Sequence, residues 1–132
     1  MLEKKIINTS KAPKAIGPYS QGVVSNGHIF LSGQIPLNKN GELFDASIQE
    51  QVELIFENIS YLLETQNCTF QNIVKLTVFL KDIGDFDAVN SKIIELLEEP
   101  YPARSLIQAA ALPKNVDVEI EVIAGLNENG ER

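Results

Sequence analysis

The stretch VVSNGHIFLSG, residues 23–33, carries a strong local signal for secondary structure. Its Asn26-Gly27 pair lies between two apolar runs and suits a two-residue type I′ turn, because both central residues of that turn need a positive φ. The stretch therefore predicts a β-hairpin with strands at residues 21–25 and 28–33. A short strand is expected before it, and a loop with two prolines separates the two.

Two amphipathic helices are predicted further along the chain. Ser47 and Glu50 have the spacing of a capping box, in which the two residues satisfy each other's free backbone donors, so a helix should begin there. Apolar residues then recur at spacings of three and four, which gives the helix one apolar side to about Thr65. A second helix is expected from about Asp85, and two prolines lie beyond its end.

The remaining strands show apolar residues at alternate positions. In IVKLTVFLK, residues 73–81, the side chains expected to face the core are Val74, Leu76, Val78 and Leu80. Further strands are predicted at 103–110 and 116–124, and the first short strand at 3–8. The order of elements predicts an α+β fold, a six-stranded mixed sheet with two helices packed on one face.

Composition narrows the classes of function. A chain of 132 residues is expected to be one domain, residues 1–132. A net charge of −7 argues against a broad phosphate-binding surface, so no nucleic-acid partner is expected. The single cysteine excludes an intrachain disulfide, and no apolar run is long enough to span a bilayer. A soluble, cytoplasmic protein without a membrane partner is the expectation.

The sheet face away from the helices is predicted to carry Thr77, Phe79, Leu106 and Ile123 along with charged residues, which makes it too apolar to be a purely solvated face. Contiguous apolar surface often marks an association site, so a homo-oligomer built on this face is expected. The alternative is that these are scattered exposed residues of no consequence.

Arg104, in the stretch YPARS at residues 101–105, is the main candidate for ligand binding. It alternates with small residues, so we expect it to point away from the helices, as Leu106 would. If its strand neighbours the last strand, Arg104 and Glu119 share one side of the sheet. A guanidinium can bind a carboxylate through two parallel hydrogen bonds, so Arg104 could hold an acidic substrate. A plain interface ion pair with Glu119 or Glu121 is equally open.

Other candidates are weaker. His28 and Cys68 are expected to have no chemical role, and the sequence offers neither a metal-ligand set nor a phosphate-binding glycine pattern. We therefore predict no metal and no cofactor. Tyr19, in the loop GPYSQG, offers a hydroxyl that can donate or accept a hydrogen bond, although a simple packing role is the alternative.

Five segments together resemble the Rid family, also called YjgF, which includes the 2-iminobutanoate/2-iminopropanoate deaminases. They are AIGPYSQGV (15–23), LSGQIPLNKNGEL (31–43), IVKLTVFLKDIGDFDAVN (73–90), YPARS (101–105) and LPKNVDVEIEVIA (112–124). The likeness covers nearly the whole chain in order. It implies a chorismate-mutase-like fold, a barrel-shaped homotrimer and clefts between subunits.

The resemblance also implies an activity, the hydrolysis of reactive 2-imino acids to 2-oxo acids and ammonia without a cofactor. Arg104 would hold the substrate carboxylate, and Glu119 would handle the water. The other site residues that it implies are Tyr19, Ser32, Gly33, Asn90 and Leu106. Two alternatives stay open: a trimeric regulatory protein that binds small carboxylates without catalysis, or a ribonuclease that inhibits translation.

Two positions depart from the family pattern. Leu106 stands where many relatives carry a cysteine, so only backbone contacts are expected to be kept there. The stretch KIIELLEEP, residues 92–100, is shorter than usual and lacks the aromatic residues that relatives often have on the second helix.

Overall fold

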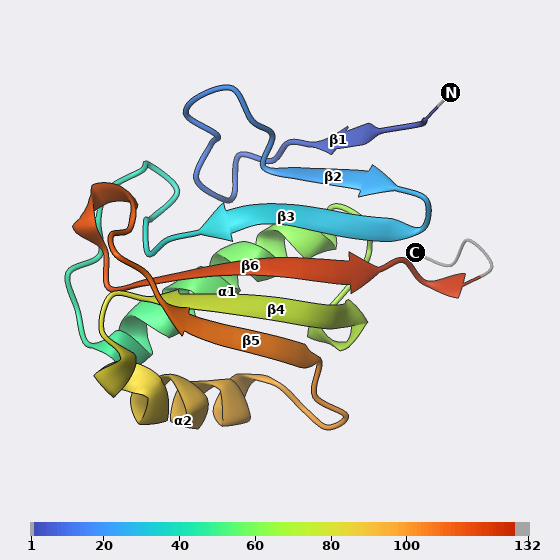
Figure 1. Ribbon diagram of the computed structural model, residues 1–132. Helices are drawn as coiled ribbons and strands as arrows, with labels where there is room; N and C mark the ends of the chain where they lie inside the picture. The colour runs from blue at the N-terminus through green and yellow to red at the C-terminus, as the bar shows by residue number, and fades with distance from the viewer. Residues whose placement is uncertain (1, 129–132) are drawn as a thin grey trace.

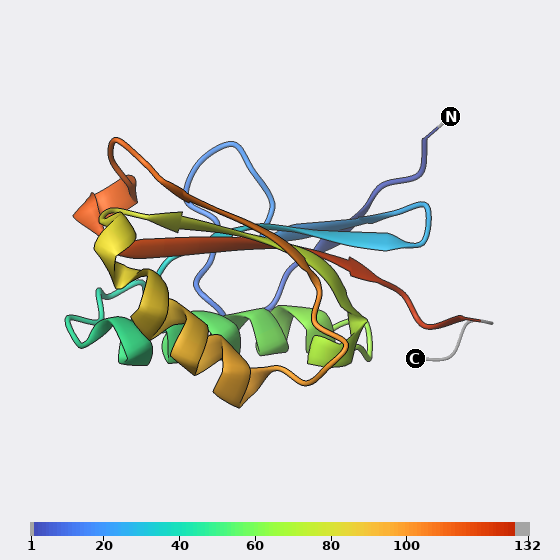
Figure 2. The ribbon, with the colours of Figure 1, turned by 60° about the horizontal axis from the view of Figure 1, so that its bottom comes forward.

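One mixed sheet organises the computed structural model, which describes residues 2–128. The sheet order is β1-β2-β3-β6-β4-β5, and only the β4–β5 pair is parallel (Figure 1). The strands are β1 (Lys5–Ile7), β2 (Gly22–Ser25), β3 (His28–Gln34), β4 (Ile73–Leu80), β5 (Ala103–Gln108) and β6 (Val118–Gly125). Helices α1 (Ile48–Glu64) and α2 (Phe86–Leu96) lie against one face (Figure 2), so the predicted fold class is confirmed.

The hairpin and the first helix form as their sequences predict. Asn26 and Gly27 have φ values of 52° and 79°, which the type I′ turn between β2 and β3 requires. At the start of α1, Ser47 Oγ accepts from the Glu50 N–H at 3.2 Å, and Glu50 Oε1 accepts from the Ser47 N–H at 3.3 Å. The capping box is therefore present.

The core lies between the helices and one sheet face. Helix α1 contributes a long buried side, whereas α2 buries only Val89 and Ile93. Strand β5 is an edge strand of the sheet and runs beside α2 (Figure 1). Phe86 and Asn90 of α2 are not buried, and both contact Arg104 of β5. Among residues 2–128, no helix is both long and apolar enough to cross a membrane.

A β-bulge at the start of β4 makes one core prediction wrong. Ile73 pairs with Ala124 and Lys75 pairs with Ile123, so the register shifts at Val74. Val74 is consequently 50% exposed, and Ile73 takes the buried position. The other three expected core positions of this strand are buried.

Strand β5 faces the opposite way from the prediction. It pairs in parallel with β4, with Arg104 opposite Leu76 and Leu106 opposite Val78. Leu76 and Val78 are buried beneath the helices, so Arg104 and Leu106 also lie on the helix face. The expectation that both point away from the helices is wrong, because pairing with β4, and not the run of small residues, sets the orientation.

Candidate functional site

Arg104 is held in place by helix α2. One guanidinium nitrogen, Nη1, donates a hydrogen bond to Asn90 Oδ1, and the guanidinium carbon lies 5.4 Å from the ring centroid of Phe86. The ion pairs found within residues 2–128 are formed by Lys11 and Lys92, not by Arg104. Arg104 is therefore ordered on two sides, while its charge has no carboxylate partner in the described part of its own chain.

Glu119 lies on the other face of the sheet. It stands opposite Phe79 of β4, whereas its neighbours Val118 and Ile120 are fully buried under the helices. Strand β4 also separates β6 from β5. The expectation that Arg104 and Glu119 share one side of the sheet is therefore wrong, and an ion pair between them within one chain is excluded.

The Glu119 carboxylate rests directly over Gly33. A Cβ added at Gly33 would overlap Glu119 Oε2 and would lie 2.9 Å from its Cδ, so only glycine leaves room for the carboxylate in this position. Burial raises the pKa of the Glu119 carboxyl above its ordinary value, and the nearby Glu121 carboxylate raises it further. Glu119 can therefore exchange a proton at a pH closer to neutral than a free glutamate can.

Tyr19 and Ser32 are joined by the loop that precedes β2. Ser32 donates from Oγ to the Ser20 carbonyl at 2.6 Å and from its N–H to the Gln21 carbonyl at 3.0 Å. The hydroxyl of Tyr19 accepts from the Ile16 N–H at 3.3 Å, and about half of the Tyr19 side chain is exposed. This network fixes the tyrosine loop to the end of β3.

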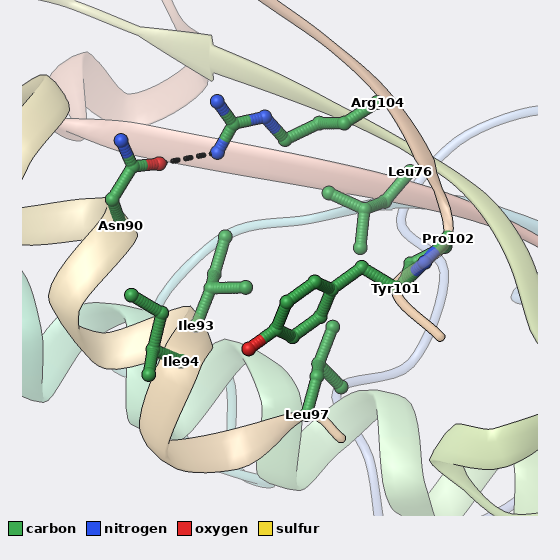
Figure 3. Close-up of a pocket in the computed structure, with 8 residues that line it drawn as sticks. All are labelled: Leu76, Asn90, Ile93, Ile94, Leu97, Tyr101, Pro102 and Arg104. Carbon is green, nitrogen blue, oxygen red and sulfur yellow. Dashed lines mark hydrogen bonds between the residues drawn. The ribbon is translucent and has the colours of Figure 1, made fainter. Parts of the chain in front are cut away.

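The predicted site residues fall into two groups. Tyr19, Ser32, Gly33 and Glu119 line a cavity of about 600 Å³ at one end of the sheet. Arg104 and Asn90 line a second cavity of about 260 Å³, between α2 and β5 (Figure 3). Leu106 is half-buried against the core and lines neither cavity. One chain therefore carries two half-sites and does not bring them together.

Two positioning residues had no clear sequence signal. Gln21 is buried, and its Nε2 donates to the carbonyls of Thr9 and Pro13 at 3.1 and 2.9 Å while its Oε1 accepts from the Thr9 N–H at 2.7 Å. A buried glutamine cannot be told from an exposed one by pattern. Phe86 is an apolar residue at the start of α2, and its type and position predict burial in the core; it is nevertheless 39% exposed and contacts the guanidinium of Arg104.

The chemistry available at these half-sites is carboxylate binding and proton transfer. Arg104 supplies the cation, and Glu119 supplies the titratable group. Within residues 2–128, no three His, Cys, Asp or Glu side chains come together as a potential metal site.

Comparisons with known proteins identify the family of the chain. The model of the family described as endoribonuclease L-PSP matches residues 9–126. A protein of Lactococcus lactis, provisionally named regulator AldR, is 49% identical over 91% of this chain and 96% of its own length. The 2-iminobutanoate/2-iminopropanoate deaminase of Capra hircus is 44% identical over 93% of this chain and 90% of its own length.

A solved structure supports the same assignment. The crystal structure of E. coli TdcF with bound serine is 42% identical, covers 93% of this chain and 99% of its own, and superimposes with a TM-score of 0.87. The chain therefore belongs to the endoribonuclease L-PSP family, the Rid family that its sequence segments resemble, together with the 2-iminobutanoate/2-iminopropanoate deaminases.

Proposed function

We propose that this chain is a homotrimeric deaminase that hydrolyses 2-imino acids, such as 2-iminobutanoate and 2-iminopropanoate, to 2-oxo acids and ammonia. The observation that carries the proposal is the guanidinium of Arg104, which is ordered by Asn90 and Phe86 and has no carboxylate partner within residues 2–128. Such a group is suited to bind a small carboxylate through two parallel hydrogen bonds. Relatives named as deaminases of this type support the choice of substrate.

Each active site would be completed by two subunits. Arg104 and Glu119 lie on opposite faces of one sheet, so a substrate of a few carbon atoms cannot touch both in one chain. A second copy can bring its Glu119 half-site to the Arg104 half-site of the first. The face away from the helices carries the exposed apolar side chains Phe30 and Ile107, which would be covered by association of this kind.

The reaction needs only positioning and proton transfer. The reacting form is the imine protonated at nitrogen, C=NH2+. Arg104 holds the carboxylate next to the imine carbon, and Glu119 of the neighbouring subunit takes one proton from the water while the remaining hydroxide bonds to this carbon and the C=N π electrons move to nitrogen. The product of addition carries a hydroxyl and an amino group on the same carbon. Glu119 returns its proton to the nitrogen, and the C–N bond breaks as ammonia leaves. The hydroxyl proton passes to the Glu119 carboxylate and then to the ammonia, so the products are the 2-oxo acid and ammonium.

Tyr19 and Gly33 would shape the water side of the site. Tyr19 offers a hydroxyl at the rim of the Glu119 cavity, where it can orient the water. Gly33 lets the carboxylate of Glu119 lie close to the β3 backbone. The raised pKa of Glu119 fits the proposed exchange of a proton in both directions.

The experiment that tests this function measures ammonia release from imino acids generated in situ. Because imines also hydrolyse unaided, the quantity of interest is the acceleration over buffer. A parallel assay traps the imine as a semicarbazone, and the protein should suppress its formation. If the purified protein accelerates neither 2-iminobutanoate nor 2-iminopropanoate hydrolysis, the proposed activity is wrong.

A regulatory role is the second candidate, because a relative 49% identical over most of the chain carries a regulator's name. That role would need Arg104 to hold a carboxylate but would not need proton transfer by Glu119. Glu119→Gln should then bind small carboxylates and keep its regulatory output. A ribonuclease role is less well supported, since a net charge of −7 opposes binding of RNA.

Gly33→Ala is expected to lower kcat/KM by about tenfold or more while leaving the thermal midpoint nearly unchanged. The added methyl overlaps the Glu119 carboxylate and displaces it from the site, and a displacement of the catalytic group of about 1 Å can cost on the order of 100-fold. Gly33 has no positive φ, so the backbone tolerates alanine. Steady-state kinetics and differential scanning calorimetry check the two effects. Unchanged kinetics would show that the position of Glu119 over Gly33 does not matter.

A further inference from the structure

The cavity beside Arg104, which we call the α2–β5 pocket, is lined by several apolar residues that have no role in the proposed reaction. The pocket is defined by Leu76, Ile93, Ile94, Leu97 and Tyr101, with Arg104 at its rim (Figure 3). Leu76, Ile93 and Leu97 are buried side chains, so the floor of the pocket is fixed by the core. Apart from Arg104, Asn90 and the hydroxyl of Tyr101, the side chains that line it are apolar (Figure 3).

The size of the pocket suits a short aliphatic group. Its volume is about 260 Å³. A closed apolar cavity of about 150 Å³ is large enough to bind benzene, which has six carbons. A side chain of three or four carbons therefore fits, even with part of the pocket open to solvent.

The positive charge of Arg104 at the rim determines which polar group the ligand should carry beside its aliphatic chain. Arg104 uses one nitrogen for Asn90 and stacks on Phe86, and its charge has no carboxylate partner within residues 2–128. A ligand that satisfies both features carries a carboxylate next to an aliphatic chain. In a 2-imino acid, the carboxylate and the side chain are both bonded to the reacting carbon, so they can occupy the rim and the pocket at the same time.

We propose that the α2–β5 pocket receives the substrate's side chain and selects 2-imino acids with branched aliphatic side chains of three or four carbons, such as the imine of leucine. The inference rests on the proposed function and deepens it. With the carboxylate on Arg104 and the side chain in the pocket, the imine carbon stays at the mouth, where the neighbouring subunit can present Glu119. Short imino acids would leave the pocket unfilled.

Ile94 is the residue at which this selection can be tested. It lies one turn after Asn90 on the same side of α2, it lines the pocket, and it is 62% exposed. A large side chain at this position can cover the pocket with little disturbance of the core. Ile94→Trp should therefore act on the side chain of the substrate more than on its carboxylate.

The experiment compares imines made in situ from leucine and from alanine, with ammonia release measured over the buffer rate. Each buried methylene contributes about fourfold, so wild-type kcat/KM is expected to favour the leucine imine by about tenfold or more. Ile94→Trp should reduce this preference by about tenfold, and Ile94→Ser should reduce it less. The matched control is Leu2→Trp, which places the same ring at an exposed position outside the pocket and should keep the wild-type preference.

Calorimetric binding of the two product acids, 4-methyl-2-oxopentanoate and 2-oxopropanoate, separates this inference from the proposed function. Acceleration of both imines without a preference, or a preference that Ile94→Trp and Ile94→Ser both leave intact, overturns the pocket assignment and leaves the deaminase activity standing. If the protein accelerates the hydrolysis of neither imine, the proposed deaminase activity is wrong. In that case, the binding data still test the pocket assignment. If the wild type binds the branched acid more tightly and Ile94→Trp weakens this binding, the assignment is supported. If the wild type binds the two acids equally, the assignment is wrong.

Discussion

Arg104→Ala is expected to reduce kcat/KM for 2-imino acids by about 100-fold to 10,000-fold. The substitution removes two charge-assisted hydrogen bonds to the substrate carboxylate, each contributing about 1.5–3 kcal/mol, and about 1.4 kcal/mol corresponds to tenfold in rate. Folding should be preserved, because Arg104 is exposed and its contacts are with side chains of α2. Steady-state kinetics on in situ imines measures the loss.

Arg104→Lys is the matched variant for this test. Lysine keeps the positive charge but cannot present two parallel donors in one plane, so most of the turnover should also be lost. Sedimentation velocity should give the same oligomer for both variants as for the wild type. Full activity of Arg104→Lys would contradict the binding role given to the guanidinium.

Glu119→Gln is expected to reduce kcat by about 100-fold to 10,000-fold, the usual contribution of a general acid or base. Glutamine has nearly the same shape, so the side chain can still rest over Gly33. The matched control is Glu121→Gln, which removes a carboxylate from the same face two residues away and should keep most of the activity. Equal losses in the two variants would argue against a specific role for Glu119.

The pH dependence of the wild type follows from the direction of the pKa shift. Glu119 must be deprotonated to take a proton from water, so kcat/KM should rise with pH through a pKa above the ordinary value of 4.5. Glu121→Gln should move this rise in kcat/KM to lower pH, because the substitution removes one cause of the raised pKa of Glu119. The same pKa shift also affects the stability of the fold. The stabilisation that Glu119 contributes is fully present below the pKa that this carboxyl has in the unfolded chain, and it is lost as the pH rises through the higher pKa that it has in the folded chain.

Local patterns in the sequence were sufficient for the secondary structure and for the layers of the fold. Asn26-Gly27 and the Ser47 cap each define a boundary through their own backbone requirements, so both could be predicted from neighbouring residues. The alternation in β6 identified its buried face for the same reason. Val74 could not be predicted, because the bulge depends on the pairing of β4 with β6.

The candidate site depends on long-range pairing, and this is where sequence reasoning failed. The direction of Arg104 is set by its parallel register with Leu76, and the small residues on either side of it gave the opposite answer. Placing Glu119 beside Arg104 assumed that β5 and β6 are neighbours, whereas β4 lies between them. The types of residue in the site could be read from the sequence, but their distribution over two faces required the fold.

The most direct test of the account is to mix two inactive variants, Arg104→Ala and Glu119→Gln, by unfolding and refolding them together in equal amounts. If each site takes Arg104 from one subunit and Glu119 from its neighbour, random assembly gives an intact pair in about one quarter of the sites, and the mixture should recover about one quarter of the wild-type activity. Refolding each variant alone should recover about 1% of the wild-type activity or less. Mass spectrometry under native conditions would verify that mixed oligomers form. No recovery in verified mixed oligomers would contradict a site shared between subunits.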